Sequence, residues 1–152
     1  MLSIDDSVYI AGHKGMVGSS LYRLFFQKGF KNILTTSRTE IDLTNKVQVE
    51  NWFKFNKPKI VIIAAAKVGG IAINSKYPTE FLVENIEIQN NIILNAWKNK
   101  TKRFLFLGSS CIYPKYAKQP IREEELLSGY LEPTNASYAL AKITGIRLCN
   151  SL

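Results

Sequence analysis

Two side chains near the end of the sequence have the types and the spacing for acid–base chemistry. Tyr138 and Lys142 are four residues apart in a pattern typical of a helix, so both are expected on one helical face. A phenol has a pKa of ~10, and acid–base work at neutral pH needs a decrease of ~3 units, worth ~4 kcal/mol. A neighbouring ammonium typically supplies about 1–3 of those units. Taken singly, Tyr-x-x-x-Lys is more often surface decoration, so its meaning depends on the surrounding motifs.

Ser109 is the third candidate for this chemistry. It lies in a Ser-Ser pair after the apolar run FLFLG, where its hydroxyl could hydrogen-bond the substrate oxygen that Tyr138 protonates. Together with a glycine-rich turn near the start of the sequence, and in this order, the serine and the Tyr–Lys pair favour an oxidoreductase site.

The glycine-rich turn is GHKGMVG, in which Gly12, Gly15 and Gly18 are three residues apart. The first glycine would allow a sharp turn, the second would let backbone amides approach a pyrophosphate, and the third would let the helix pack close to the strand. The helix N-terminus adds unpaired N–H groups and a partial positive charge. An ordinary strand-to-helix turn is the alternative, but the flanking pattern favours nucleotide binding.

The end of the second apolar run indicates which dinucleotide is bound. An acidic residue there would bind the adenosine ribose hydroxyls, whereas this sequence has Arg38, with Lys14 in the glycine turn. Two cations near one ribose favour NADP over NAD. A solvated arginine at a strand end is the alternative. Asp42 could accept a hydrogen bond from the adenine amino group.

Alternating apolar runs and helical patterns must position these residues. Buried strands are predicted at residues 7–12, 32–37, 59–66 and 103–110, and helices follow them from residue 16, around residues 47–53, over residues 78–99 and from residue 134 or 137 to the end. Residues 67–78 and 111–135 are predicted loops, the second long enough to be functional. This alternation predicts a Rossmann-like, doubly wound parallel α/β sheet with strand order 3-2-1-4 and a crevice at the carboxyl ends of strands 1 and 4.

Bulk properties agree with a globular enzyme. The 152 residues are 46% hydrophobic and 21% charged, no apolar run reaches the ~18 residues of a membrane span, and the N-terminus does not look like a signal peptide. The net charge of +8 comes from scattered basic residues, which argues against a nucleic-acid partner. Cys111 and Cys149 show no metal spacing and are too few for a disulfide framework, which predicts a cytoplasmic protein without a metal site.

The motifs, in this order, resemble the extended short-chain dehydrogenase/reductases that act on nucleotide sugars. The longer stretches AGHKGMVGSSL, AAAKVGGIAINSKYPTEFLVENIEIQNNII, FLGSSCIYPK and QPIREEELLSGYLEPTNASYALAKITGIRLC look like the GDP-L-fucose synthase family. This resemblance covers nearly the whole chain. It implies an NADP-dependent enzyme that epimerises GDP-4-keto-6-deoxy-D-mannose at C3 and C5 and then reduces the C4 ketone.

The resemblance also implies roles for individual residues. Ser109, Tyr138 and Lys142 match the family's catalytic serine, tyrosine and lysine, with Tyr138 donating the proton at C4. Cys111 matches the cysteine that transfers protons during epimerisation; without the resemblance, a small buried packing residue is an equally good interpretation. The expected cofactor-binding residues are Gly12, Lys14, Gly15, Met16, Val17, Gly18, Arg38, Asp42, Leu43, Ala64, Ala65, Ala66, Tyr138 and Lys142.

The sequence departs from the family in two ways. The family pairs the cysteine with a histidine downstream of the Tyr–Lys helix, but the only histidine here is His13, in the glycine turn. Family members are also considerably longer and have a C-terminal substrate domain. We therefore expect residues 1–152 to form an incomplete NADP-binding Rossmann domain without the substrate domain, stabilised as a homodimer or other homo-oligomer, or by a companion chain. The alternatives are a non-catalytic NADP-binding scaffold and another nucleotide-sugar epimerase or dehydratase.

Overall fold

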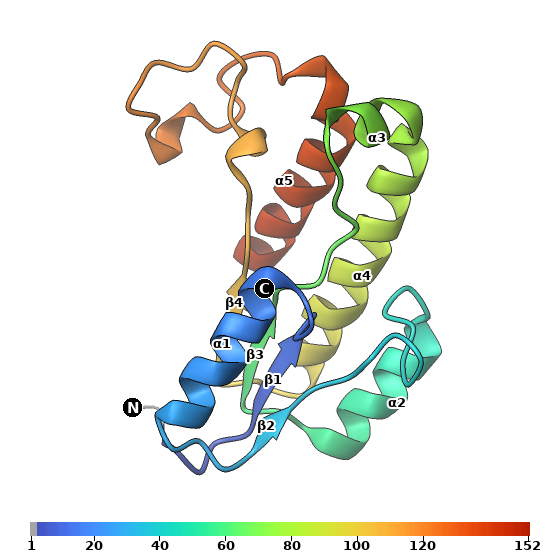
Figure 1. The fold of residues 1–152 in the computed structure, drawn as a ribbon, viewed down its shortest axis with the longest axis vertical. Coiled ribbons are helices and arrows are strands. Elements are labelled where there is room, and N and C mark those ends of the chain that lie inside the picture. Colours follow the sequence, from blue (N-terminus) through green and yellow to red (C-terminus); the bar gives the residue numbers. More distant parts are fainter. Residues whose placement is uncertain (1–2) are drawn as a thin grey trace. The chain divides into compact units, whose positions relative to one another are not determined.

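The computed structural model describes residues 3–152 and contains one four-stranded parallel sheet (Figure 1). The strands are β1 (Val8–Ala11), β2 (Ile33–Leu34), β3 (Ile60–Ile63) and β4 (Arg103–Phe106). All four lie in the first of two compact units, which comprises the chain up to residue 66, residues 87–107 and residue 152. The expected α/β class with a Rossmann-like parallel sheet is confirmed.

The strand order is β2-β1-β3-β4, so the predicted order 3-2-1-4 is wrong. β1 and β3 are buried at every position and pair along their full lengths, from Val8 opposite Ile60 to Ala11 opposite Ile63. β2 is only half-buried and two residues long. A strand that is apolar throughout is most stable with neighbours on both sides, which places β3 inside and leaves β2 at the edge. The winding reverses between β1 and β3, and the ligand crevice of such a sheet is expected there.

Three helices complete the first unit. α1 (Met16–Gln27) packs through Leu21 and Phe25 against the sheet face that carries Val8, Ile10, Ile60 and Ile62. On β1 the alternate residue Tyr9 stacks on Trp52 of α2 (Lys46–Asn56), with ring centroids 4.1 Å apart. The third helix is α4 (Pro78–Lys98), whose residues from 87 onward belong to this unit. Each sheet face is therefore covered by apolar side chains, because successive residues of a strand point to opposite faces.

The second unit comprises residues 67–86 and 108–151. It contains α3 (Ile71–Lys76), the first turns of α4, α5 (Ala136–Ser151) and three short 3₁₀ helices, η1 (Ser110–Ile112), η2 (Glu123–Glu125) and η3 (Pro133–Asn135). Residues 67–78 were predicted to be a loop, and α3 corrects that prediction. The buried side chain of Asn74 donates hydrogen bonds to the carbonyls of Gly69 and Gly70 at 2.8 and 3.1 Å, which stabilises this short helix at its start.

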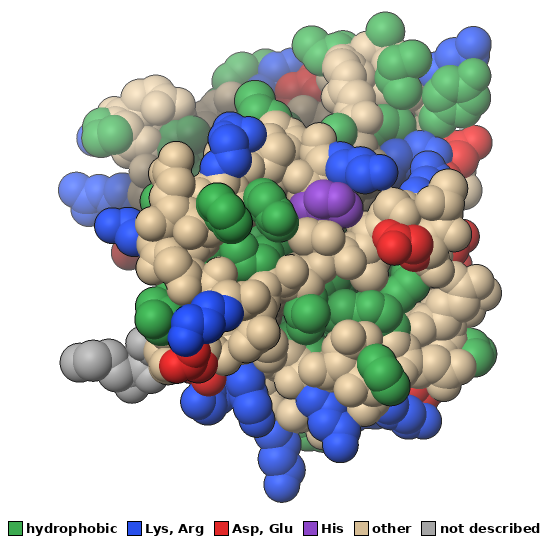
Figure 2. Space-filling model, turned by 60° about the horizontal axis from the view of Figure 1, so that its bottom comes forward, with side chains coloured by type: hydrophobic (Ala, Val, Ile, Leu, Met, Phe, Trp, Pro, Cys, Tyr) green, Lys and Arg blue, Asp and Glu red, His purple; other side chains and the backbone are tan. Residues whose placement is uncertain are grey.

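The surface agrees with the scattered basic residues of the sequence. Figure 2 shows Lys and Arg side chains distributed over the visible face, with acidic side chains among them, rather than gathered in one patch. Within residues 3–152, no helix is long and apolar enough to cross a membrane.

Candidate functional site

The glycine turn connects β1 to α1 and is shaped by two of its three glycines. Gly12 has φ of +85°, and a Cβ there would lie 2.6 Å from the Ala65 nitrogen. At Gly18 a Cβ would lie 2.1 Å from the Gly12 carbonyl oxygen. Both positions therefore need glycine for the turn and for the close packing of α1 on it, as the sequence predicted for the first and third glycines.

Gly15 differs from the other two glycines. A Cβ at Gly15 would meet only the Gly12 carbonyl oxygen, at 3.4 Å, which is an ordinary contact. Gly15 is the N-cap of α1, and no side chain among residues 3–152 caps that helix end. The fold itself therefore does not require glycine at this position. The N–H groups of the first helical turn have no side-chain cap from the described part of the chain, which fits the approach of an anionic ligand. Met16 and Val17, predicted to contact the cofactor, are exposed at this end.

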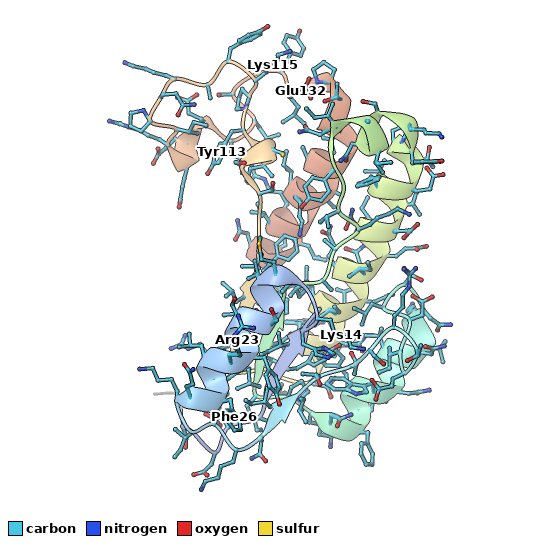
Figure 3. All side chains as sticks on the ribbon, in the orientation of Figure 1. Lys14, Arg23, Phe26, Tyr113, Lys115 and Glu132 are labelled. Atoms are coloured by element: carbon cyan, nitrogen blue, oxygen red, sulfur yellow. The ribbon has the colours of Figure 1, made fainter. Side chains whose placement is uncertain are left out.

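Basic groups lie beside the glycine turn. Lys14 is exposed and projects from the turn (Figure 3). The pKa of the Glu40 carboxyl is lowered, first by hydrogen bonds from the hydroxyl and the amide of Ser37, both at 2.6 Å, and then by the charges of Lys14 and His13. The Nδ1 atom of His13 is buried and has no hydrogen-bond partner among the described residues. Buried polar atoms normally have a hydrogen-bond partner. The lack of one at this nitrogen within residues 3–152 fits a site where a bound ligand supplies the hydrogen bond.

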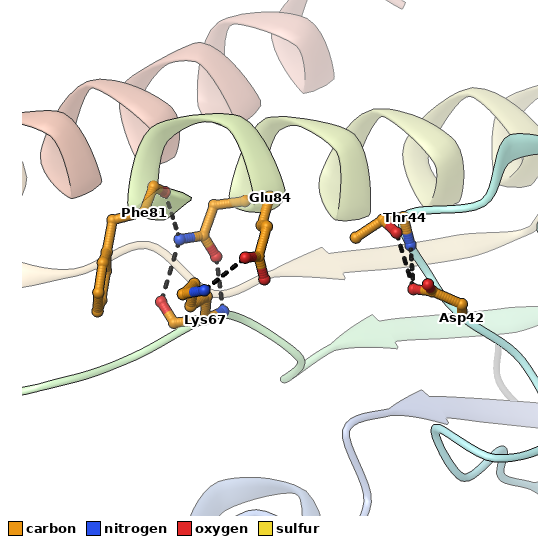
Figure 4. A network of polar contacts seen from close by, with 6 residues as sticks. Asp42, Thr44, Lys67, Phe81 and Glu84 are labelled. Carbon is orange, nitrogen blue, oxygen red and sulfur yellow. Dashed lines mark hydrogen bonds and ion pairs between the residues drawn. The ribbon is translucent and has the colours of Figure 1, made fainter. Parts of the chain in front are cut away.

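Asp42 forms the turn that leads into α2. Its Oδ1 accepts hydrogen bonds from the Thr44 amide at 3.0 Å and the Thr44 hydroxyl at 2.8 Å (Figure 4). These bonds, with a smaller effect of Arg38, lower the pKa of Asp42. Arg38 itself is exposed and within electrostatic range of this carboxylate. One carboxylate oxygen is thus committed to the turn, and the contact of Asp42 with adenine stays a prediction.

The remaining predicted cofactor residues of the first unit lie in two adjoining backbone segments. The Leu43 carbonyl accepts a hydrogen bond from Asn91 of α4 at 2.9 Å, which holds the segment after β2 in place. Ala64 continues from β3, and its N–H donates to the Ala11 carbonyl of β1 at 2.9 Å. The backbone of Ala64 and Ala65 packs directly against Gly12, and Ala66 follows. The structure thus brings the ends of β1 and β3 together where the winding reverses.

In the second unit, Lys67 is held in place by α4. Asn85 accepts from the Lys67 N–H at 2.8 Å and donates to the carbonyls of Lys67 and Phe81 at 3.0 and 2.7 Å (Figure 4). The Lys67 ammonium pairs with Glu84. Both polar groups of the Lys67 backbone are therefore satisfied by one buried side chain, which fixes the conformation at this residue.

The second unit also contains the predicted acid–base residues. Ser109 caps η1, its hydroxyl accepting from the Cys111 N–H at 3.3 Å. The side chain of the same serine lies near Tyr138 and lowers the pKa of its phenol. Tyr138 and Lys142 lie one turn apart on α5, with the Lys142 Nζ 5.9 Å from the centre of the Tyr138 ring. The fold of this unit thus brings Ser109, Cys111, Tyr138 and Lys142 into one cluster.

Burial, rather than charge, dominates the ionisation of this cluster. Lys142 is only 4% exposed, and desolvation lowers its pKa to about 8. Desolvation and the nearby Cys111 raise the pKa of Tyr138, and the hydrogen bond from Ser109 only partly offsets them. The expected lowering of the phenol pKa is therefore wrong, because desolvation of the phenol itself is the largest contribution and raises its pKa. A phenol of this kind keeps its proton at neutral pH and can donate it.

Asn135 belongs to the same cluster but was not singled out from the sequence. It is the last residue of η3, and its Nδ2 donates to the Cys111 Sγ at 3.3 Å. Glu132 is the N-cap of η3, and its carboxylate accepts hydrogen bonds from the Thr134 N–H at 2.9 Å and from the Thr134 hydroxyl. The Glu132 Oε1 atom also lies 3.8 Å from the Lys115 Nζ (Figure 3). Residue type alone gave no signal for Asn135, since an asparagine just before a helix usually indicates a cap.

Comparisons with known proteins identify the family and its similar members. The model of the NAD dependent epimerase/dehydratase family matches residues 8–152. Among curated relatives, the chain is 50% identical over 151 residues to a putative GDP-L-fucose synthase 2 of Arabidopsis thaliana, covering 99% of this chain and 46% of that protein. It is 51% identical over 144 residues to the GDP-L-fucose synthase of Escherichia coli K12, covering 95% of this chain and 45% of that protein.

A solved structure gives a similar picture. A GDP-mannoheptose C4 reductase from Campylobacter jejuni with NADP bound is 39% identical, with a TM-score of 0.96 over 99% of this chain and 48% of that one. The chain therefore spans about half the length of the curated relatives and the structure that it matches.

Proposed function

The chain belongs to the NAD dependent epimerase/dehydratase family, and on that premise we propose that it carries the NADP-binding part and the Ser109–Tyr138–Lys142 site of a nucleotide-sugar epimerase–reductase. The proposed reaction converts GDP-4-keto-6-deoxy-D-mannose to GDP-L-fucose. The observation that supports the proposal is the cluster itself, in which Ser109 lies close enough to Tyr138 to lower its pKa and the buried Lys142 lies one turn away, with its Nζ 5.9 Å from the centre of the Tyr138 ring. Similarity to GDP-L-fucose synthases supports the choice of sugar.

The cofactor residues proposed are those of the glycine turn and its neighbours. The amides at the N-terminus of α1, beside Gly15, bind the pyrophosphate. Lys14 and Arg38, both exposed, bind the ribose 2′-phosphate, because cations attract the phosphate dianion that distinguishes NADP from NAD. The other proposed cofactor-binding residues line the adenosine part of the cofactor and its path along the sheet; they are Asp42, Leu43 and Ala64 to Ala66. Bound NADPH supplies the hydride for reduction.

The residues of the cluster have distinct proposed tasks. Tyr138 donates its proton to the C4 oxygen as the carbon is reduced, and its raised pKa keeps that proton available at neutral pH. Ser109 hydrogen-bonds the same oxygen and fixes its position. Lys142, with a pKa of about 8, is mostly protonated at pH 7 and stabilises the phenolate that remains after the transfer. Cys111 exchanges protons at the epimerised carbons.

The first test is of binding. We expect NADPH to bind the chain more tightly than NADH in a fluorescence titration, and Arg38→Ala to remove about tenfold of that preference, since one phosphate contact with a cation is lost. Equal binding of the two cofactors, or no binding, contradicts the proposed cofactor site.

The second test is of turnover with the GDP-keto sugar, followed at the nicotinamide absorbance. Tyr138→Phe should lower the rate of reduction by about 10²–10⁴-fold with NADPH affinity unchanged, because only the proton donor is removed. Tyr130→Phe is the matched control, since Tyr130 is 95% exposed. NADPH binding without turnover by the wild-type chain would favour the alternative of a non-catalytic NADP-binding module.

A further inference from the structure

The side chain of Asn135 is arranged around the Cys111 sulfur. Its Nδ2 donates to the Cys111 Sγ at 3.3 Å. Its own backbone N–H donates to the Glu132 carbonyl at 3.3 Å, which fixes the main chain of η3 at this residue. Its Oδ1 is buried and has no hydrogen-bond partner among residues 3–152. The hydrogen bond to the sulfur is therefore the contact that orients this amide.

We propose that Asn135 is a positioning residue for Cys111, holding the sulfur by an N–H hydrogen bond and stabilising its thiolate form. This inference rests on the proposed function, in which Cys111 exchanges protons with the sugar. An amide does not itself take up or release a proton at neutral pH, so Asn135 acts only through the hydrogen bond. A donor to an anionic acceptor is stronger than one to a neutral acceptor, and the bond therefore favours the thiolate over the thiol.

The thiolate is the form that epimerisation needs. A C–H bond beside the C4 ketone breaks, its proton passes to the sulfur, and the electron pair moves onto the ketone as an enolate. A thiol that has kept its proton cannot accept this one. Fixing the sulfur also fixes the direction from which the proton is removed, and proton transfer requires hydrogen-bond distance.

Charged and titratable groups lie on the elements that pack against η1 and η3. Tyr138 and Lys142 come from α5, which packs against η1, and Tyr138 interacts electrostatically with Cys111. Glu132 and its partner Lys115 lie at η3, and α3, which packs against η3, contributes Lys76. Glu132 is engaged by Thr134. The side chain that donates a hydrogen bond to the sulfur is that of Asn135, at 3.3 Å.

The test measures alkylation of Cys111 by iodoacetamide from pH 6 to 9 in the full chain carrying Cys149→Ser. We expect Asn135→Ala to slow alkylation at pH 7 by about fivefold to tenfold and to move the pH profile to higher pH, because the thiolate loses its donor. Asn135→Asp, nearly isosteric but with a negative charge in place of the donor, should slow it further. Asn150→Ala, on the exposed side of α5, is the control and should leave the profile unchanged.

Each outcome decides the inference. An unchanged rate in Asn135→Ala overturns it, and a faster rate would mean that the thiol donates to the amide oxygen, which also overturns it. If Asn135→Ala does not fold, judged by thermal unfolding, Asn135→Asp decides the matter, because it keeps the shape of the side chain.

The alkylation result is independent of turnover. If the wild-type chain does not act on the GDP-keto sugar but the alkylation rates change as expected, the pairing of amide and thiol stands and the proposed function fails. If the wild-type chain is active, Asn135→Ala should lower deuterium incorporation from D₂O into the sugar by about tenfold while reduction of an already epimerised substrate is unaffected. A purely structural role of Asn135 would lower both.

Discussion

Tyr138 and Lys142 share one face of α5, and burial acts on their protons in opposite directions. It raises the pKa of the phenol and lowers that of the ammonium to about 8. Each group is thereby shifted toward its neutral form, since a low-dielectric environment disfavours charge of either sign. The phenol remains a proton donor, and the lysine, which is mostly protonated below pH 8, can stabilise a negative charge that develops beside it. The pair is thus suited to stabilise a charge that exists only during proton transfer.

The lysine should leave a pH signature on stability. Because its pKa is about 8 when folded and about 10.5 when unfolded, only the unfolded state holds this proton between those values. The free energy of unfolding therefore rises with pH from about 8 to 10.5, and the penalty of about 3 kcal/mol is fully present below pH 8. Lys142→Met should remove this rise, measured as urea midpoints at pH 7, 8, 9 and 10.

Other groups titrate in the same range, and the comparison must account for them. The pKa values of Tyr138 and Cys149 are raised, which lowers stability as pH rises above their ordinary values. These contributions cancel when the free energy of unfolding of Lys142→Met is subtracted from that of the wild type at each pH. If that difference does not change between pH 7 and 10, the lysine does not titrate as its burial implies.

At the scale of elements, two glycines of the turn between β1 and α1 have different roles: the fold requires Gly18, whereas we expect Gly15 to serve ligand binding. Gly18→Ala would place a methyl carbon 2.1 Å from the Gly12 carbonyl and should lower the free energy of unfolding by about 3 kcal/mol. Gly15→Ala meets an ordinary contact of 3.4 Å and should change stability by less than about 1 kcal/mol. Denaturant unfolding and NADPH titration of both variants measure the two effects.

We expect the two effects to separate in Gly15→Ala. This variant should lose NADPH affinity by about tenfold while remaining stable, since the methyl group occupies the approach to the helix amides. The two variants are matched, because each adds one methyl group to the same turn. Equal loss of stability in both would show that Gly15, too, serves only the fold.

The main elements were predictable because their patterns are strong. Val8–Ala11 and Ile60–Ile63 are continuous apolar runs next to glycine or proline signals, and both are fully buried strands. The helix Pro78–Lys98 begins at the predicted proline and ends within one residue of the predicted end. Burial on both faces and a clear 3.6-residue period are properties of the local sequence, so they can be read from it directly.

What could not be predicted depends on contacts between distant residues. The sheet order follows from the relative burial of β2 and β3, which a run such as NILTTS does not reveal. α3 is six residues long and begins after two glycines, so its pattern is too short to distinguish from a loop. Asn135 gains its significance only from Cys111, 24 residues earlier in the chain. The Tyr–Lys spacing indicated a site, but the ionisation of its members is set by burial.

At the scale of the whole molecule, the sheet ends at β4 with an edge that no strand of residues 3–152 pairs. Leu105 of this strand is 48% exposed. An unpaired strand with exposed apolar side chains is a template for pairing with another chain, because its N–H and C=O groups and its side chains are all better satisfied there. Association, with a second copy or with a companion chain, stays a prediction, and β4 is the edge through which we expect it.

Sedimentation velocity over micromolar concentrations tests this association. We expect the wild-type chain to associate with increasing concentration and Leu105→Lys to weaken the association at least tenfold, since a charged side chain on an edge strand opposes pairing with another chain. Val47→Lys is the matched control: Val47 lies on α2 and is 64% exposed, so it adds the same charge away from the edge. A monodisperse wild-type monomer throughout the range, or equal effects of the two lysines, would show that β4 is not the contact. In that case the edge is protected by Arg103, because this residue at the start of the strand is exposed and like charges on two copies repel.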